Sequence, residues 1–255
     1  AAAILRIKLI IYENNLFIGK ANKYLSPFAQ KIFVSSKALE GLSNKYFMKT
    51  EEIGNIIEKK ILSFSKLQAI NQNINKLNIL VLGGSQAAKI FADILPDIFY
   101  QCKNNGVELK IFQQCLLEQN SKLNTFYKKS QIEFETFNFS NDLTNYFSKT
   151  NLAITRSGSS MLAELTNANI PFISIPLPTS ADNHQFKNAL YYENKNFSFL
   201  VEEKEINNKL GNLLKKIYND VSILQKLSRN QSQYSDKDVY NNINKALKKI
   251  LDEKN

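Results

Sequence analysis

The stretch Asn78-Ile-Leu-Val-Leu-Gly-Gly-Ser-Gln-Ala-Ala-Lys89 decides the fold, because an apolar run leads into two glycines and a serine and then into a helical segment. The run Ile79 to Leu82 is typical of a strand buried on both faces of a parallel sheet. Gly83 and Gly84 let the backbone approach a ligand, and the first N–H groups of the helix, with Ser85 predicted at the N-cap, face the loop. The stretch predicts a phosphate-binding turn, although a plain strand-to-helix connection fits it equally well.

The bulk composition describes a globular chain without an obvious membrane span. The 255 residues, 44% of them hydrophobic, suffice for one large core or two small ones. No window approaches the ~20 apolar residues that cross a bilayer, so we expect a soluble or peripheral protein. The start, Ala1 to Tyr12, lacks Met and runs directly into a strand-like segment, so we expect a chain that begins inside a domain. Two cysteines without CxxC spacing favour a reducing compartment, and no metal-ligand spacing is visible.

The formal charge of +10 invites a nucleic-acid or membrane interpretation. Only Arg6, Arg156 and Arg229 are arginines, and the many Lys, Asn and Ile residues are what an AT-rich coding sequence produces. The lysines are scattered along the chain instead of forming a stripe. We therefore expect no nucleic-acid binding, and at most a weak, salt-sensitive attraction to anionic lipid.

Residues 77 to 201 alternate between strand-like and helical segments. The expected strands are 79–82, 108–112, 132–137, 152–155, 172–175 and 197–201, and the expected helices are 86–103, 119–129, 141–149, 160–167 and 182–194. This alternation predicts an α/β fold with a Rossmann-like, doubly wound parallel sheet. Upstream, strands at 7–12 and 31–35, a helix at 18–28 and a segment 47–53 that leads to the Gly54–Asn55 turn precede a polar linker. The end, 204–251, is helical, and its last part, 239–251, is amphipathic.

Ligands of such sheets bind at the carboxyl ends of the strands, so the loops there are candidate sites. One loop is Arg156-Ser-Gly-Ser-Ser-Met-Leu-Ala-Glu164, and another is Pro176-Leu-Pro-Thr-Ser-Ala-Asp-Asn-His-Gln-Phe-Lys-Asn-Ala189, which opens a helix with Asp182 as the expected cap. Ser159 or Ser160 fits a plain N-cap.

Three polar side chains in these loops are candidate ligand-binding residues. Glu164, beside a helix N-terminus, is expected to stay ionised and to accept hydrogen bonds from two ribose hydroxyls. Gln185 offers a donor and an acceptor to sugar hydroxyls. His184, the only histidine, fits a general base, but also a hydrogen-bonding or packing residue. No Ser-His-Asp set is present.

Taken together, GGSQAAK, TRSGSSMLAEL and PLPTSADNHQFKNA, in this order and spacing, resemble the donor-binding half of the MurG-type glycosyltransferase family. Upstream, Tyr12-Glu-Asn-Asn15, Gly19, Asn22 and the Gly54–Asn55 turn are similar to the family's segment that closes the N-terminal domain. The resemblance covers the chain from about Ile7 to the C-terminal helices. It implies a GT-B fold in which the N-terminal Rossmann-like domain is truncated.

The resemblance also implies an activity and a set of substrate-binding residues. The activity is transfer of N-acetylglucosamine from UDP-N-acetylglucosamine to lipid I, forming lipid II in peptidoglycan synthesis, with no cofactor and no metal. The implied substrate-binding residues are Asn15 on the acceptor side, Gly83, Gly84, Ser85 and Gln86 at the diphosphate, Phe139 and Ser140 at the uracil, Ser159, Ser160, Met161, Leu162, Ala163 and Glu164 at the ribose and phosphate, and His184 and Gln185 at the sugar. The implied domains are an acceptor-domain remnant at 1–62, a linker at 63–76, a UDP-sugar-binding domain at 77–235 and a C-terminal helix at 236–255. The implied location is peripheral, on the cytoplasmic face of the bacterial inner membrane and against its anionic surface.

Several positions depart from the family pattern. The arginine expected after the Gly54–Asn55 turn is replaced by Glu58, so only Lys59 or Lys60 can restore the charge. Ala87 replaces the third glycine of the GGSQGA motif. The glycine-rich loop with the family's catalytic histidine is absent from the sequence, so the catalytic residue is unassigned. The alternatives are a nucleotide-sugar-binding module that is inactive without a separate N-terminal polypeptide, and a nonspecific basic interaction protein.

Overall fold

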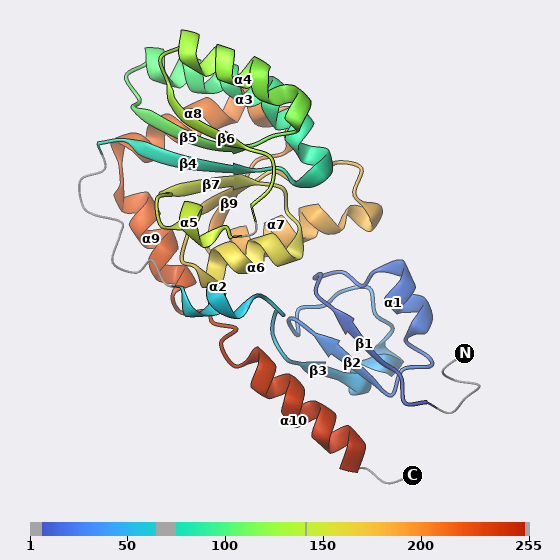
Figure 1. Cartoon of the computed structure of the whole chain (residues 1–255). Helices are drawn as coiled ribbons and strands as arrows, with labels where there is room; N and C mark the ends of the chain where they lie inside the picture. Colours follow the sequence, from blue (N-terminus) through green and yellow to red (C-terminus); the bar gives the residue numbers. More distant parts are fainter. Residues whose placement is uncertain (1–6, 65–74, 141, 253–255) are drawn as a thin grey trace.

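The chain forms two parallel β-sheets, and helices cover both faces of the larger sheet (Figure 1). The structure is a computed structural model that describes residues 7–64, 75–140 and 142–252, without the side chains of 84–88. Every strand pairing within these residues is parallel. The sheets confirm the α/β class that the alternation of strands and helices predicts.

The small sheet has three strands in the order β1-β2-β3. Its elements are β1 (Ile10–Glu13), α1 (Lys20–Leu25), β2 (Lys31–Val34), the 3-10 helix η1 (Asn44–Lys49) and β3 (Thr50–Glu52). Because side chains alternate along a strand, Ile32 and Val34 pack on the face that includes Leu25 of α1, whereas Phe33 packs on the other face. That other face is covered by the C-terminal helix α10 (Val239–Asp252), which leaves the large sheet to reach it (Figure 1).

The large sheet has six strands in the order β6-β5-β4-β7-β8-β9, a doubly wound arrangement. Its strands are β4 (Leu77–Leu82), β5 (Leu109–Gln114), β6 (Glu133–Phe137), β7 (Leu152–Thr155), β8 (Phe172–Ser174) and β9 (Ser198–Leu200). Its helices are α2 (Lys59–Ser63), α3 (Gly84–Asn104), α4 (Leu117–Lys129), α5 (Thr144–Phe147), α6 (Ser159–Asn167), η2 (Ala181–Asn183), α7 (His184–Asn194), η3 (Glu203–Glu205), α8 (Ile206–Asn219) and α9 (Ser222–Gln231). The predicted strands and helices are thereby confirmed, with boundaries shifted by up to three residues.

We call the part of the chain that forms the six-stranded sheet and its helices the large unit, and the part that forms the three-stranded sheet the small unit. The core of the large unit lies in two layers, one on each face of the sheet. Along β4, Ile79 and Val81 pack with α3, α4 and α8, whereas Leu80 and Leu82 pack with α2, α5, α6 and α7. All four side chains are at most 3% exposed. A strand buried on both faces needs apolar residues at every position, which is why this one reads as an unbroken apolar run.

The helices at the carboxyl ends of the strands begin differently from the prediction. Helix α3 begins at Gly84 with Gly83 as the N-cap, so Ser85 lies within the first turn and is not the cap. Helix α6 has Gly158 as its N-cap, so neither predicted serine caps it. The predicted cap Asp182 is also wrong: it lies in η2 with φ 51°, and left-handed Asn183 precedes α7 without a side-chain cap bond. Asp and Asn tolerate this left-handed backbone better than most residues, so the loop turns there before the helix starts.

The Gly54–Asn55 turn joins the two units and is held by the chain near α10. Asp236, 4% exposed, accepts hydrogen bonds from the Asn55 backbone N–H at 2.8 Å and from the Asn55 Nδ2 at 3.1 Å. Asn167 of α6 donates to the same carboxylate at 2.8 Å. Most of the predicted linker lies outside the described residues, and the domain boundaries at 62, 76 and 235 remain a proposal.

Candidate functional site

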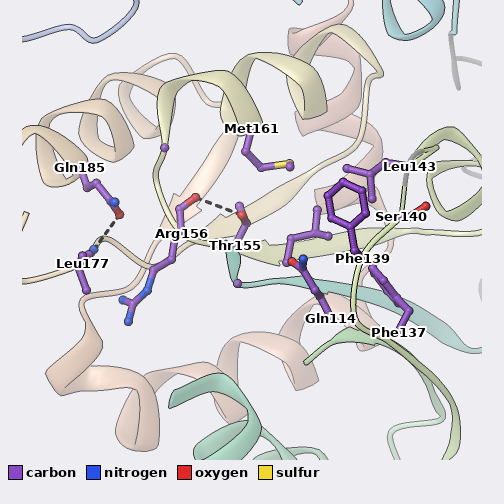
Figure 2. Close-up of a pocket in the computed structure, with 13 residues that line it drawn as sticks. Gln114, Phe137, Phe139, Ser140, Leu143, Thr155, Arg156, Met161, Leu177 and Gln185 are labelled. Carbon is purple, nitrogen blue, oxygen red and sulfur yellow. Dashed lines mark hydrogen bonds between the residues drawn. The ribbon is translucent and has the colours of Figure 1, made fainter. Parts of the chain in front are cut away.

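A cavity of about 400 Å³ opens at the carboxyl ends of β4 to β7, where the strand order reverses (Figure 2). Its lining consists of Leu82, Gly83, Gln114, Phe137, Phe139, Ser140, Leu143, Thr155, Arg156, Gly158, Met161, Leu177 and Gln185. Its position is the one at which open α/β sheets bind ligands. The cavity brings together five residues of the predicted site, namely Gly83, Phe139, Ser140, Met161 and Gln185.

Two helix N-termini face this cavity, and each is capped by a glycine. Gly83 caps α3 and Gly158 caps α6, and both residues line the cavity. Helix N-termini offer unpaired N–H groups and a positive dipole end, which together favour an anion. A Cβ built on Gly158 would meet no atom within 4 Å, so no neighbouring protein atom requires glycine here. Its missing side chain instead leaves room in the cavity.

The opposite wall is aromatic and comes from the end of β6. Figure 2 shows the Phe139 ring beside Ser140 and Leu143, on the far side of the cavity from Gln185. Phe139 is 74% exposed, an unusual state for a phenylalanine. The Ser140 hydroxyl is fixed by Asp142, because it donates to the Asp142 carbonyl at 2.9 Å and accepts from the Asp142 N–H at 3.2 Å. The wall provides a flat apolar surface with backbone groups next to it, as a nucleobase requires.

Gln185 lies in the first turn of α7 and organises the loop opposite Phe139. Its Oε1 accepts hydrogen bonds from the backbone N–H group of Ser157 at 3.2 Å and from that of Leu177 at 3.0 Å, the second of which is drawn in Figure 2. Its Nε2 donates to no described residue. The side chain is therefore held by its oxygen, and its two N–H donors remain available at the cavity.

Glu164 lies one turn after Met161 on α6, at the sixth of nine positions, and not beside the helix N-terminus as predicted. Burial, reinforced by the negative charge of Glu58 and partly offset by Lys60, raises the pKa of Glu164 to about 7. At neutral pH the carboxyl group is therefore only partly ionised in the unliganded protein, whereas the sequence predicts a fully ionised one. No described residue donates a hydrogen bond to it, so its oxygens are available to hydroxyl donors.

The two candidate replacements for the missing arginine point in different directions. The Lys59 Nζ lies over the Tyr240 ring of α10, 5.4 Å from its centroid. The Lys60 Nζ lies 3.8 Å from Asp142 and 3.0 Å from Glu58, on the side of the cavity where Ser140 lies. Of these two lysines, Lys60 is therefore the cation placed toward the cavity.

Arg156 lines the cavity but is engaged in holding the fold. Its Nη1 donates to the carbonyls of Ile175 at 3.2 Å and Pro176 at 3.1 Å, and its Nη2 pairs with Glu203. The residue is 8% exposed and its guanidinium lies 5.0 Å from the centroid of the Phe91 ring. This buried arginine joins β7, β8 and η3 through both Nη atoms, whereas its buried Nε has no hydrogen-bond partner among the described residues.

Six of the remaining predicted site residues, namely Asn15, Ser159, Ser160, Leu162, Ala163 and His184, do not line this cavity. Leu162 and Ala163 are 0% exposed and their side chains pack in the core, because they lie on the sheet-facing side of α6. Ser159, 8% exposed, lines a smaller cavity between the two units, and Ser160 is exposed. His184 bonds through Nδ1 to the Ala181 carbonyl at 2.7 Å, the hydrogen-bonding role left open by the sequence. Asn15 lies at the contact between the units, and the side chains of Gly84, Ser85 and Gln86 are outside the described part.

Eight cavity residues are missing from the predicted site, namely Leu82, Gln114, Phe137, Leu143, Thr155, Arg156, Gly158 and Leu177. Gln114 and Thr155 are the last residues of β5 and β7, so a rule that counts every strand end would have found them. In the described residues, no group of three or more His, Cys, Asp or Glu side chains is placed to hold a metal ion.

Comparison with known proteins places the chain in a family. Residues 78–243 match the glycosyltransferase family 28 C-terminal domain. A protein of Pelagibacter ubique, named UDP-N-acetylglucosamine--N-acetylmuramyl-(pentapeptide) pyrophosphoryl-undecaprenol N-acetylglucosamine transferase, is 36% identical over 254 residues, 99% of this chain and 70% of that protein. A Rickettsia bellii protein of the same name is 32% identical over 234 residues. The chain belongs to the MurG family of glycosyltransferases.

Solved structures agree on the fold. The crystal structure of Acinetobacter baumannii MurG matches with a TM-score of 0.75 and 23% identity, covering 97% of this chain and 69% of that one. The pneumococcal O-GlcNAc transferase GtfA, in complex with UDP and GlcNAc, matches with a TM-score of 0.61 and 14% identity. The GT-B fold expected from the resemblance is thus confirmed. The chain spans 70% of the P. ubique protein and 66% of the R. bellii protein, slightly less than two thirds in the latter case.

Proposed function

We propose that the chain serves in the transfer of N-acetylglucosamine from UDP-N-acetylglucosamine to lipid I, the step that makes lipid II for the bacterial cell wall. The named relatives carry this activity in their names, and the chain matches one of them along 99% of its length. The observation that carries the proposal is the cavity itself, because two helix N-termini and an exposed aromatic face meet at the reversal of strand order. These features match the diphosphate and the base of a nucleotide sugar.

Each part of the donor has a partner in this proposal. The diphosphate lies against the N-termini of α3 and α6, next to Gly83 and Gly158. The uracil lies against Phe139 and takes hydrogen bonds from the backbone near Ser140. The ribose hydroxyls donate to Glu164, and the transferred sugar meets the free amide nitrogen of Gln185.

The chemistry follows from charge. When the glycosidic bond breaks, negative charge develops on the leaving diphosphate, and fixed N–H dipoles stabilise that charge without reorganising. Lys60, which pairs with Glu58 and Asp142, adds a positive charge near this site. The acceptor hydroxyl approaches from the small unit, where Asn15 lies. No general base is assigned among the described residues, and we propose that a separate N-terminal polypeptide supplies it if the chain acts in trans.

A lipid-linked acceptor requires a membrane-facing surface, and the small unit has a suitable one. Four large apolar side chains are exposed there: Tyr24 at 76%, Phe28 at 55%, Phe47 at 39% and Met48 at 90%. The Lys49 Nζ donates to the carbonyls of Ser26, Pro27 and Ala29, so η1 lies beside the turn that carries Phe28. Residues 20–50 hold six lysines and one glutamate.

This basic and apolar surface is more than the dispersed lysine charge expected from the sequence. We place it against the anionic inner membrane on its cytoplasmic face, as a peripheral contact. No helix in the described ranges is long and apolar enough to cross a bilayer. Apolar insertion and lysine attraction together stabilise membrane binding more than either does alone.

The transfer assay that tests the proposal uses the whole chain, UDP-N-acetylglucosamine and a soluble lipid I analogue. We expect donor binding with transfer that is slow or absent, and transfer at a rate at least about 10²-fold higher when the N-terminal portion of a relative is supplied in trans. Donor binding without transfer under both conditions would favour the alternative function, a nucleotide-sugar-binding module. The absence of both binding and transfer would contradict the proposal.

A further inference from the structure

Asn188 of α7 joins the two units through a fully buried side-chain amide. Its Oδ1 accepts the Leu16 backbone N–H at 3.1 Å, and its Nδ2 donates to the Asn15 Oδ1 at 3.3 Å and to the Ser157 carbonyl at 3.1 Å. The residue is 0% exposed. Water therefore cannot replace a lost partner without entering the interface, which makes the three bonds depend on one another.

On the side of the small unit, Asn15 is fixed by a buried carboxylate. Glu13, 3% exposed, ends β1, and its Oε1 accepts both the Asn15 N–H and the Asn15 Nδ2 at 3.0 Å. Its Oε2 accepts the Gly19 N–H at 2.8 Å and the Asn22 Nδ2 at 2.9 Å. Four donors thus bind one carboxylate, and they hold Asn15 rigidly with respect to the small sheet.

On the side of the donor cavity, Asn188 acts together with Gln185. The two residues are three positions apart on α7 and so share one face of the helix. Both hold Ser157: Gln185 accepts its N–H, and Asn188 donates to its carbonyl. Gln185 also accepts the Leu177 N–H and lines the cavity. The loop that shapes the donor cavity is therefore fixed by the same helix face that contacts the small unit.

We infer that Asn188 is a positioning residue that couples the seating of the small unit on α7 to the shape of the donor-sugar cavity. The inference rests on the proposed donor binding for its consequence, but its geometry exists without a ligand. When Asn15 is seated, Asn188 is oriented to hold Ser157, and Gln185 is held in place by the Ser157 and Leu177 N–H groups. When Asn15 is displaced, the Asn188 amide loses its orientation and the loop loosens.

The first test needs no ligand. In Asn15→Ala, amide hydrogen exchange followed by NMR should show faster exchange at Ser157 and Leu177, although neither residue touches Asn15. Asn14→Ala is the matched control, because Asn14 also bridges the units, through its Nδ2 to the Ser160 Oγ at 3.3 Å, but makes no described hydrogen bond to Asn188 or Ser157. Its Oδ1 accepts the Asn15 Nδ2 at 3.5 Å, and loss of that long bond leaves the same Nδ2 held by Glu13 at 3.0 Å. The control should leave both amides at their wild-type rates. Wild-type exchange at Ser157 and Leu177 in Asn15→Ala would overturn the inference.

The second test measures the consequence by calorimetry with UDP-N-acetylglucosamine. Asn15→Ala and Asn188→Ala should each weaken binding by about fivefold or more, and the double variant should bind no more weakly than Asn188→Ala alone. Asn14→Ala should bind within about twofold of wild type. Additive losses in the double variant would mean that the two residues act separately, and the inference would fail.

The two tests separate failure of the inference from failure of the proposed function. If wild type does not bind the sugar nucleotide while exchange at Ser157 still responds to Asn15→Ala, the coupling stands and the donor assignment is wrong. If wild type binds and neither exchange nor affinity responds to Asn15→Ala, the donor assignment stands and the coupling is wrong. Should Asn188→Ala fail to fold, the pair Asn15→Ala and Asn14→Ala decides alone.

Discussion

At the scale of single residues, the protonation of Glu164 contributes a dependence of stability on pH between about 4.5 and 7. Burial raises its pKa from 4.5 to about 7, so the folded state holds a proton that the unfolded state releases. Its contribution to stability is therefore present below about pH 4.5 and is lost as the pH rises to about 7. Glu164→Gln keeps the shape of the side chain but cannot ionise, so this variant should not lose stability as the pH rises.

We expect Glu164→Gln to be more stable than wild type at pH 8 by up to about 2 kcal/mol, with a much smaller difference at pH 5. Urea denaturation at the two pH values measures the change in the free energy of unfolding. An equal difference at both pH values would show that Glu164 titrates normally in the folded protein.

The Glu164 carboxylate is also expected to contribute to ligand affinity. Glu164→Ala should weaken UDP binding by about 2 to 3 kcal/mol, because a charge-assisted pair of hydrogen bonds to the ribose is lost. Gln185→Ala should weaken UDP-N-acetylglucosamine binding more than UDP binding, since its amide is assigned to the sugar. Calorimetry with both ligands decides; an equally large loss of UDP affinity in both variants would refute the assignment of roles.

Gly158 tests whether the cavity itself is the ligand site. Its φ of −67° suits any residue and a Cβ meets no protein atom, so Gly158→Ala should change stability by less than about 1 kcal/mol. The added methyl should weaken UDP-sugar binding about tenfold by occupying ligand space. Gly211→Ala in α8, away from the cavity, is the control and should bind normally. Unchanged affinity in Gly158→Ala would place the ligand elsewhere.

At the scale of elements, the Gly54–Asn55 turn depends on its contact with Asp236. Gly54 has φ 94°, and a Cβ there would lie 2.6 Å from the Asp236 Oδ1. Gly106, with φ 82° and no atom within 4 Å of its added Cβ, has a similar backbone without the contact. Gly106→Ala should cost about 1 to 2 kcal/mol from the left-handed backbone alone.

Gly54→Ala should cost at least about 1 kcal/mol more than Gly106→Ala, because the buried carboxylate must move and loses hydrogen bonds. Chemical denaturation of the two variants gives the difference. If both variants lose the same stability, the Asp236 contact does not hold the turn.

Sequence patterns predict these elements well where periodicity is local and poorly where partners are remote. The apolar run of β4 and the glycine at 83 show their roles within a few residues, whereas the role of Gly158 at the start of α6 was not predicted. Asn188 could not be recognised, because its partners Asn15 and Leu16 lie more than 170 positions away. The state of Glu164 also escapes prediction, since it depends on burial and on a carboxylate contributed by residue 58.

At the scale of the whole molecule, the exposed cluster of Tyr24, Phe28, Phe47 and Met48 on the small unit determines how strongly the protein binds to membranes. Met48→Asp places a charge on the most exposed member of that cluster. Co-sedimentation with anionic vesicles at 0.15 M salt should persist for wild type and fall several-fold for Met48→Asp, since apolar insertion is not screened by salt. Leu117→Asp, at a 76% exposed site on α4 of the large unit, is the control and should bind like wild type. Loss of wild-type binding at this salt concentration would mean that dispersed lysine charge alone attracts the protein.

The measurement that decides most directly whether this chain is a donor-binding glycosyltransferase unit is a calorimetric titration with UDP-N-acetylglucosamine, repeated in EDTA and with the corresponding ADP sugar. Helix N-termini and backbone donors need no cation, so we predict binding that EDTA leaves unchanged and that is at least about tenfold tighter than binding of the ADP sugar. No binding of UDP-N-acetylglucosamine at millimolar concentration, or binding that requires a divalent metal, would contradict the proposal.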